Sequence, residues 1–195
     1  MAVDEIDPAT AEEWRAWLEA NGQSTGAVWF VVHHKGAATS GIPFDEAVEH
    51  ALCYGWIDGQ ARKRDDVSHC VRFSPRSPKS TWSKVNRARV ERLVERGLMT
   101  ERGQAMVDLA KRTGTWDLLA EAQDGIVPAD LQALLDEDEV AATNFHALSP
   151  ASKRAVLEGI ARAKRPETRQ RRLGEAVELA RWDVRRSGRA GPSVP

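Results

Sequence analysis

The sequence predicts an α+β protein in which a small mixed β-sheet with covering helices is followed by an all-helical C-terminal unit. The first part of the chain alternates helical periodicity with β-branched and aromatic runs, whereas the pattern after Asp124 and Gly125 is helical throughout. With 195 residues, 42% hydrophobic and 29% charged, the chain is long enough and apolar enough to bury a core. We expect an α+β domain over residues 1–122, a helical unit over 123–187 and a disordered tail over 188–195.

The N-terminal part is expected to hold two helices and three extended segments before residue 74. Apolar residues at helical spacing predict helices over 8–20 and 43–55. The run 27–35 is rich in Val, Trp and Phe and predicts a central strand. A short strand or turn is expected at 56–59, and another strand at 68–73.

Further helices follow the segment 74–80, where proline and serine prevent regular structure. Ser80 is suited to cap the first of them, and Thr100 to cap a second helix that extends to Arg112. The face of the first helix is expected to carry Trp82, Val85, Val90, Leu93 and Val94. In the C-terminal unit we expect helices that begin at Pro128, at Pro150 and at Thr168, the last of them ending at Arg185.

The net charge of −1 conceals four blocks of alternating sign. Residues 1–59 carry −8, residues 60–114 carry +8, residues 115–140 carry −8 and residues 141–195 carry +7. Such blocks are typical of solvated faces that attract one another within a fold. The alternative is a polyanion-binding surface made from the two basic blocks.

Nothing in the chain predicts membrane insertion or export. The longest apolar run, Ala27 to Val32, is too short to span a bilayer, and the acidic N-terminus is unlike a signal peptide. Without an export signal, Cys53 and Cys70 are expected to be reduced thiols. These features predict a cytoplasmic protein.

Residues 53–87 hold the side chains most typical of a binding site. Aromatic residues alternate there with glycines and one carboxylate, and basic residues then approach a helix start, where free N–H groups favour an anion. Arginine can bind phosphate or carboxylate with two parallel hydrogen bonds. We therefore expect a pocket for a small anionic or phosphorylated ligand, lined by Tyr54, Trp56, Asp58, Arg72, Arg76, Ser80, Trp82, Ser83 and Asn86.

The same residues also have a purely structural interpretation, in which Asp58 pairs with Arg72 or Arg76 to fix a turn and the tryptophans fill the core. Cys53 lies near a helix C-terminus, which raises a thiol pKa, so it is expected to be a small buried hydrophobe rather than a nucleophile. His33 and His34 would face opposite sides of a strand and could not chelate together. We expect no metal and no cofactor.

Four segments resemble the YdeI/OmpD-associated proteins, an OmdA-like family described as bacteriocin-protection proteins. These segments are Ala51–Gly59, Arg72–Arg76, Ser80–Asn86 and Ala163–Arg172, and the resemblance runs from about Trp14 to about Leu179. It implies a role in resistance to bacteriocins or cationic antimicrobial peptides and a link to an outer-membrane porin. It implies no catalytic residues.

We therefore expect a cytoplasmic bacterial accessory protein of the YdeI/OmpD-associated type that binds a small anionic or phosphorylated ligand. One alternative is an enzyme that acts on a nucleotide-like or sugar-phosphate substrate in the same pocket, with Asp58 as base. The other is an interaction module whose basic surfaces bind an acidic partner or nucleic acid. Because the chain is nearly neutral overall, nucleic acid is the less expected partner.

Overall fold

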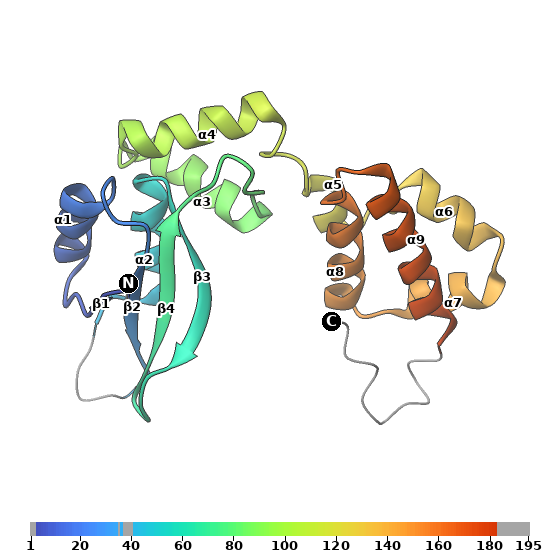
Figure 1. Ribbon diagram of the computed structural model, residues 1–195, viewed down its shortest axis with the longest axis horizontal. Coiled ribbons are helices and arrows are strands. Elements are labelled where there is room, and N and C mark those ends of the chain that lie inside the picture. The colour runs from blue at the N-terminus through green and yellow to red at the C-terminus, as the bar shows by residue number, and fades with distance from the viewer. Residues whose placement is uncertain (1–2, 35, 37–40, 183–195) are drawn as a thin grey trace. The chain divides into compact units, whose positions relative to one another are not determined.

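The computed structural model describes residues 3–34, 36 and 41–182 (Figure 1). Lys35, the last residues of the predicted final helix and the predicted tail over 188–195 lie outside the described residues. The chain divides into two compact units, Met1–Trp116 and Asp117–Pro195, and each is considered by itself. The fold class is confirmed, because a mixed sheet with helices is followed by a helical region.

The N-terminal unit contains a four-stranded sheet with the order β1-β2-β4-β3. The short β1 (Glu5–Ile6) runs parallel to β2 (Val28–His33), and β4 (Ser68–Pro75) lies antiparallel to both β2 and β3 (Trp56–Lys63). The sequence pattern missed β1, which has only two residues, and ended β3 too early. Strand β3 continues past Gly59 and Gln60, where its register with β4 shifts between Asp58 and Ala61.

The described residues of this unit also form four helices: α1 (Ala11–Asn21), α2 (Phe44–Cys53), α3 (Lys84–Glu95) and α4 (Glu101–Thr113). The predicted caps of α1 and α4 are confirmed, since the hydroxyls of Thr10 and Thr100 each accept a backbone N–H three residues on. The predicted cap of α3 is wrong: Ser83, rather than Ser80, accepts the Asn86 N–H at 3.2 Å. Trp82 therefore precedes this helix instead of belonging to it.

Two residues expected on the inner face of α3 lie on its outer face. Val85 is 60% exposed and Val94 is 48% exposed, whereas Val90 and Leu93 are buried. The five positions span too wide an arc of the helix for all of them to face one core. The apolar side of α3 is consequently narrow. Trp82 packs into the core from the segment that precedes the helix.

The core of the N-terminal unit lies between one face of the sheet and α1 and α2 (Figure 1). Trp14 of α1 packs edge-on against Phe30 of β2 and Phe73 of β4, at centroid distances of 5.1 and 5.5 Å. Its indole N–H also donates to the Ala47 carbonyl of α2 at 3.0 Å. The Trp14 side chain thus joins α1 to α2 and to strands β2 and β4.

In its described residues, 117–182, the C-terminal unit contains α5 (Ala120–Gln123), α6 (Ala129–Asp136), α7 (Glu139–Ala147), α8 (Pro150–Ala161) and α9 (Pro166–Arg181). Helices α5 and α7 were not expected from the sequence. Pro128 is the N-cap of α6, and Pro150 and Pro166 stand at the starts of α8 and α9. The core of this unit includes Leu131, Leu135, Phe145, Leu157, Ile160 and Leu173.

Ion pairs join the charge blocks of opposite sign within each unit. In the N-terminal unit acidic residues of the first block meet basic residues of the second, as in Asp45–Arg89, Glu49–Arg92 and Glu19–Arg102. In the C-terminal unit Arg169 pairs with Asp130 at 2.6 Å and Arg181 with Asp138 at 2.6 Å. Each exposed ion pair contributes about 0–1 kcal/mol to the free energy of unfolding. The charge blocks of opposite sign therefore neutralise one another but add little stability.

Candidate functional site

The predicted site residues follow one path through the fold, from the end of α2 through β3 and the end of β4 to the start of α3. Gly55 makes the first bend with φ of 74°, a left-handed conformation that favours glycine. Its carbonyl accepts the backbone N–H of Arg76 at 2.8 Å. The chain is thereby closed into a seam in which residues 54–58 lie beside residues 73–76.

The expected aromatic residues in and beside the seam are almost fully buried. Tyr54, Trp56 and Trp82 are 8%, 1% and 2% exposed. The Trp56 indole N–H donates to the Gly22 carbonyl at 3.1 Å, which satisfies its polar group inside the core. These rings act first as core side chains, as the structural interpretation expects, and only their edges could face a ligand.

Arg76 has the least ordinary environment in the seam. It is 6% exposed, and its guanidinium carbon lies 3.6 Å from the centre of the Trp82 ring. One terminal nitrogen donates to the Thr81 carbonyl at 2.8 Å, whereas the buried Nε has no hydrogen-bond partner. Burial lowers the pKa of Arg76 to about 10, and the opposing effect of Asp58 is too small to restore it.

The structure separates Arg72 from Asp58. In the ladder Asp58 lies opposite Phe73, whereas Arg72 lies opposite Trp29 of β2. Successive residues of a strand point to opposite faces of a sheet, so Asp58 shares the helix-covered face with Phe73 and Arg72 lies on the other face. The expected pairing of Asp58 with Arg72 is therefore wrong, and Asp58 acts on Arg76 only through its charge.

The polar residues before α3 are engaged in local structure. Ser80 Oγ accepts the Ser77 N–H at 3.2 Å, which closes the turn after Arg76. Ser83 caps the helix, and Asn86 Oδ1 accepts from the Arg89 guanidinium at 3.0 Å. Among the three charged residues of the nine expected, Asp58, Arg72 and Arg76, only Arg76 is buried, and in the described structure its guanidinium has no hydrogen-bonded partner of opposite charge.

Two further residues at this place could not be predicted from the sequence. Trp116 lies 4.9 Å from Trp82, and the Lys111 ammonium group lies 5.3 Å from the Trp116 ring centre. Arg76, Trp82, Trp116 and Lys111 thus form a column in which two neighbouring rings lie between two cations, and we call it the cation–ring column. Because 34 positions separate the two tryptophans in the chain, only the fold brings them together.

Behind this seam, Arg15 of α1 joins the end of α2 to the segment before α4. Its guanidinium lies 5.2 Å from the Tyr54 ring centre, 3.2 Å from His50 Nδ1 and 3.4 Å from the Leu98 carbonyl. Cys53 is fully buried beside it, and burial raises the pKa of its thiol. A buried, protonated thiol at a helix end is poorly suited to act as a nucleophile.

We expect His50 to make the N-terminal unit less stable in mild acid. Burial, reinforced by the charge of Arg15 and partly offset by Glu46 and Glu49, lowers the pKa of His50 from 6.5. The unfolded chain then binds more protons than the folded chain below about pH 6.5. Stability should be constant above that pH and fall as the pH drops through the lowered pKa.

Urea unfolding between pH 7.5 and 5, followed by tryptophan fluorescence, measures this dependence. His50→Gln should remove most of the slope, because glutamine does not titrate. His146→Gln, at an exposed position of α7, is the matched control and should retain the slope. Equal slopes for wild type and His50→Gln would contradict the assignment.

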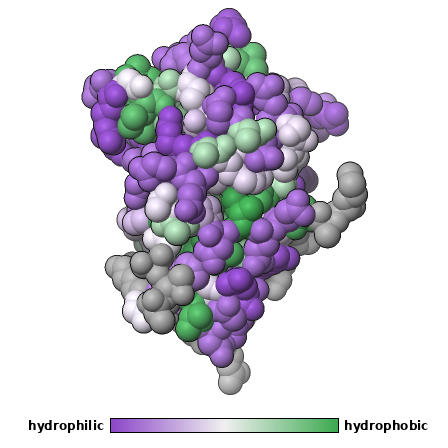
Figure 2. All heavy atoms as spheres, turned by 90° about the vertical axis from the view of Figure 1, so that its left-hand side faces the viewer, coloured by the Kyte–Doolittle hydropathy of each residue, from purple (hydrophilic) through white to green (hydrophobic). Residues whose placement is uncertain are grey.

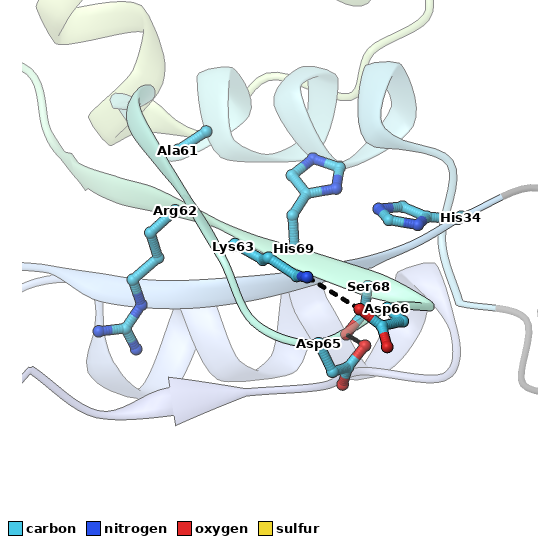
Figure 3. Close-up of a pocket in the computed structure, with 8 residues that line it drawn as sticks. All are labelled: His34, Ala61, Arg62, Lys63, Asp65, Asp66, Ser68 and His69. Carbon is cyan, nitrogen blue, oxygen red and sulfur yellow. Dashed lines mark hydrogen bonds and ion pairs between the residues drawn. The ribbon is translucent and has the colours of Figure 1, made fainter.

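A cavity of about 490 Å³ lies elsewhere, at the turn between β3 and β4 (Figure 3). It is lined by His34, Ala61, Arg62, Lys63, Asp65, Asp66, Ser68 and His69. None of the nine predicted site residues lines it. Across residues 3–34, 36 and 41–182, three or more His, Cys, Asp or Glu side chains are nowhere grouped so as to hold a metal ion.

Comparison with known families assigns each unit separately. The model of a domain of unknown function, DUF8412, matches residues 6–106, which is more than half of the chain. The chain belongs to the DUF8412 family. A second model, described as "Bacteriocin-protection, YdeI or OmpD-Associated" (OmdA), matches residues 124–181. No curated protein and no solved structure matches the chain.

The OmdA match confirms the resemblance inferred from the sequence and places it in the helical unit. Of the four segments that carried the resemblance, Ala163–Arg172 lies inside the OmdA match, and the other three lie inside the DUF8412 match. The Arg76 seam is thus part of the DUF8412 domain. Helices of the described segments are all too short or too polar to cross a bilayer.

The face of the molecule drawn in Figure 2 has no large apolar area. Figure 2 shows mainly hydrophilic residues there, with small apolar areas separated by polar ones. Isolated apolar side chains of this kind are normal for a protein surface. The seam around Arg76 therefore remains the best candidate for function in the N-terminal unit.

Proposed function

We propose that the DUF8412 domain binds a small anionic or phosphorylated ligand beside Arg76. We further propose that the protein serves in the cytoplasm as an accessory protein in resistance to bacteriocins or antimicrobial peptides, as the OmdA description suggests. The observation that carries the binding proposal is the uncompensated guanidinium of Arg76, which is 6% exposed and leaves its Nε without a partner.

A buried cation without a paired anion is costly, because protein dipoles replace its hydration poorly. Trp82 covers one face of the guanidinium and Thr81 accepts from one nitrogen, so the unmatched donor lies at the edge of the planar group. A phosphate or carboxylate oxygen is the acceptor that this edge binds best. Binding an anion would therefore relieve a cost that is present in the free protein.

The start of α3 adds to the preference for an anion. The first turn of this 12-residue helix holds no acidic residue and begins with Lys84. Free N–H groups and the helix dipole at such an end favour negative charge. Ser80, Ser83 and the turn between them would shape the approach to Arg76 by holding the backbone in place.

Asp58 is the natural competitor of the ligand. Its carboxylate raises the pKa of Arg76 through its charge and makes no hydrogen bond to it. In the free protein this charge partly stabilises Arg76, and in the complex it would repel the incoming anion. Neutralising Asp58 should therefore strengthen anion binding although it weakens the free fold.

Calorimetric titration with inorganic phosphate and with sulfate tests the proposal. We expect Asp58→Asn to bind phosphate about tenfold more tightly than wild type, and Arg76→Met to bind at least about tenfold more weakly. Arg72→Met is the matched control, because it removes an arginine from the opposite face of the same sheet. Thermal unfolding without anion verifies that each variant is folded.

A wild-type protein that binds neither anion would contradict the proposal. So would equal phosphate affinity in Arg76→Met and Arg72→Met. If Asp58 serves only to hold Arg76, Asp58→Asn should lower the unfolding temperature and leave anion affinity unchanged.

A further inference from the structure

Two histidines lie together at the opposite end of the sheet from the Arg76 seam. Val32 of β2 is the direct ladder partner of His69 in β4, and His34 follows Val32 by two residues. Both imidazoles therefore lie on the same face of the sheet as diagonal neighbours. Their ring centroids are 5.5 Å apart, with an angle of 29° between the ring planes.

This pair opens onto the cavity of about 490 Å³ at the β3–β4 turn. Figure 3 shows the two rings side by side on one side of the sheet, while Arg62 extends from the other side. His34 is exposed and His69 is partly buried, and neither ring hydrogen-bonds to a residue in the described part of the chain. All four ring nitrogens are thus available to a ligand.

The pairing of β2 with β4 holds the backbone of the two histidines in fixed positions, as a loop would not. His34 N–H donates to the Val67 carbonyl at 2.8 Å, so the backbone of both histidines is held by the hydrogen bonds of β2 and β4. Metal–nitrogen bonds of about 2.0–2.1 Å require the two donor atoms to approach to about 3 Å. Rotation of two rings that no hydrogen bond restrains provides that approach at little cost.

We propose that His34 and His69 form a two-imidazole site for a divalent transition metal ion, with water in the remaining positions. Neutral imidazole is a preferred ligand of Cu²⁺, Ni²⁺ and Zn²⁺, and Cu²⁺ binds most tightly in this series. No third protein ligand is grouped with the pair within the described residues. The site is consequently open, and a metal there could accept a further ligand from solution.

The charges around the cavity do not oppose a cation. Lys63 and Asp66, which both line the cavity, form an exposed ion pair at 2.8 Å and neutralise each other. Asp65 accepts from Val67 N–H and Ser68 Oγ and also pairs with Arg64 at 3.4 Å, and Arg62 pairs with Glu5 at 3.2 Å, so each charge that lines the cavity has a partner of opposite sign. His33 takes no part, because its Nε2 lies 2.9 Å from Asp7 on the opposite face.

Titration of the full, tag-free chain with Cu²⁺, followed by calorimetry and electron paramagnetic resonance, tests this site. We expect one Cu²⁺ per chain with hyperfine structure from two nitrogens, and release of the metal in mild acid because imidazole must be neutral to bind. His34→Ala and His69→Ala should each lower the affinity at least about tenfold, and the double variant, which keeps neither imidazole, should bind Cu²⁺ more weakly than either. His146→Ala, in α7, is the control and should bind like wild type.

Cu²⁺ affinity that is unchanged in His34→Ala or in His69→Ala would overturn the proposal, as would hyperfine structure from a single nitrogen in the wild type. Phosphate titration of the same variants separates this site from the seam. Loss of metal binding with intact phosphate binding would show that the two sites are independent.

Discussion

Gly103→Ala should destabilise the N-terminal unit by about 3 kcal/mol or more. Gly103 lies in the first turn of α4, where the helix packs against the end of α2. A β-carbon at this position would lie 2.2 Å from the Cys53 carbonyl oxygen and 2.9 Å from the Leu52 oxygen. These are backbone atoms, so neither can rotate away, and α4 would have to move off α2.

This movement would also break the contact that anchors α4. The hydroxyl of Thr100 and its backbone N–H both donate to the Cys53 carbonyl, at 2.5 and 3.1 Å. Urea unfolding followed by fluorescence reports on this unit, because six of the seven tryptophans lie in it.

Gly26→Ala is the matched control for this substitution. No described atom lies within 4 Å of the β-carbon it would add, and its φ lies outside the left-handed range. We expect a change within about 0.5 kcal/mol. Similar losses for the two variants would contradict the steric account of Gly103.

Trp82→Ala should cost about 3–5 kcal/mol in the same experiment. The side chain is 2% exposed and lies between the Arg76 guanidinium, at 3.6 Å, and the Trp116 ring, at 4.9 Å. Its removal leaves a large cavity in the cation–ring column and takes away the ring that covers buried Arg76. We expect phosphate binding to weaken as well, because Arg76 would lose its fixed orientation.

Trp82→Phe tests how much of this loss of stability comes from removing the whole aromatic ring. A phenyl ring retains a face for the guanidinium and fills part of the cavity, so the loss of stability should be clearly smaller than for alanine. Equal destabilisation of the two variants would contradict this account, because phenylalanine keeps both part of the volume and a ring face for Arg76.

Regular features of the fold could be predicted from the sequence because they depend on local patterns. The helices capped by Thr10 and Thr100 follow from the preference of threonine for N-caps, and the central strand follows from a dense β-branched run. Strand β1 could not be predicted, because Glu5–Ile6 has too few residues to show alternation and is defined by its pairing with β2.

The candidate site could be predicted only in part, for a related reason. The motif around Arg76 indicated the correct segment, since Gly55, Asp58 and Arg76 do lie along one seam. The face of the sheet on which Arg72 lies depends on the register of β4 with its neighbours. A shift of that register by one residue would move Arg72 to the other face. Trp116 and the His34–His69 pair join their neighbours through tertiary packing alone, so no spacing in the sequence indicates them.

The central claim is that the buried Arg76 guanidinium binds an anion, and nuclear magnetic resonance of its Nε–H group tests this most directly. The resonance is assigned by its absence in Arg76→Lys and followed while inorganic phosphate is added. We predict that it moves and saturates with the affinity found by calorimetry, because Nε is the donor without a partner. An Nε–H resonance that stays fixed while phosphate saturates the protein would contradict the claim.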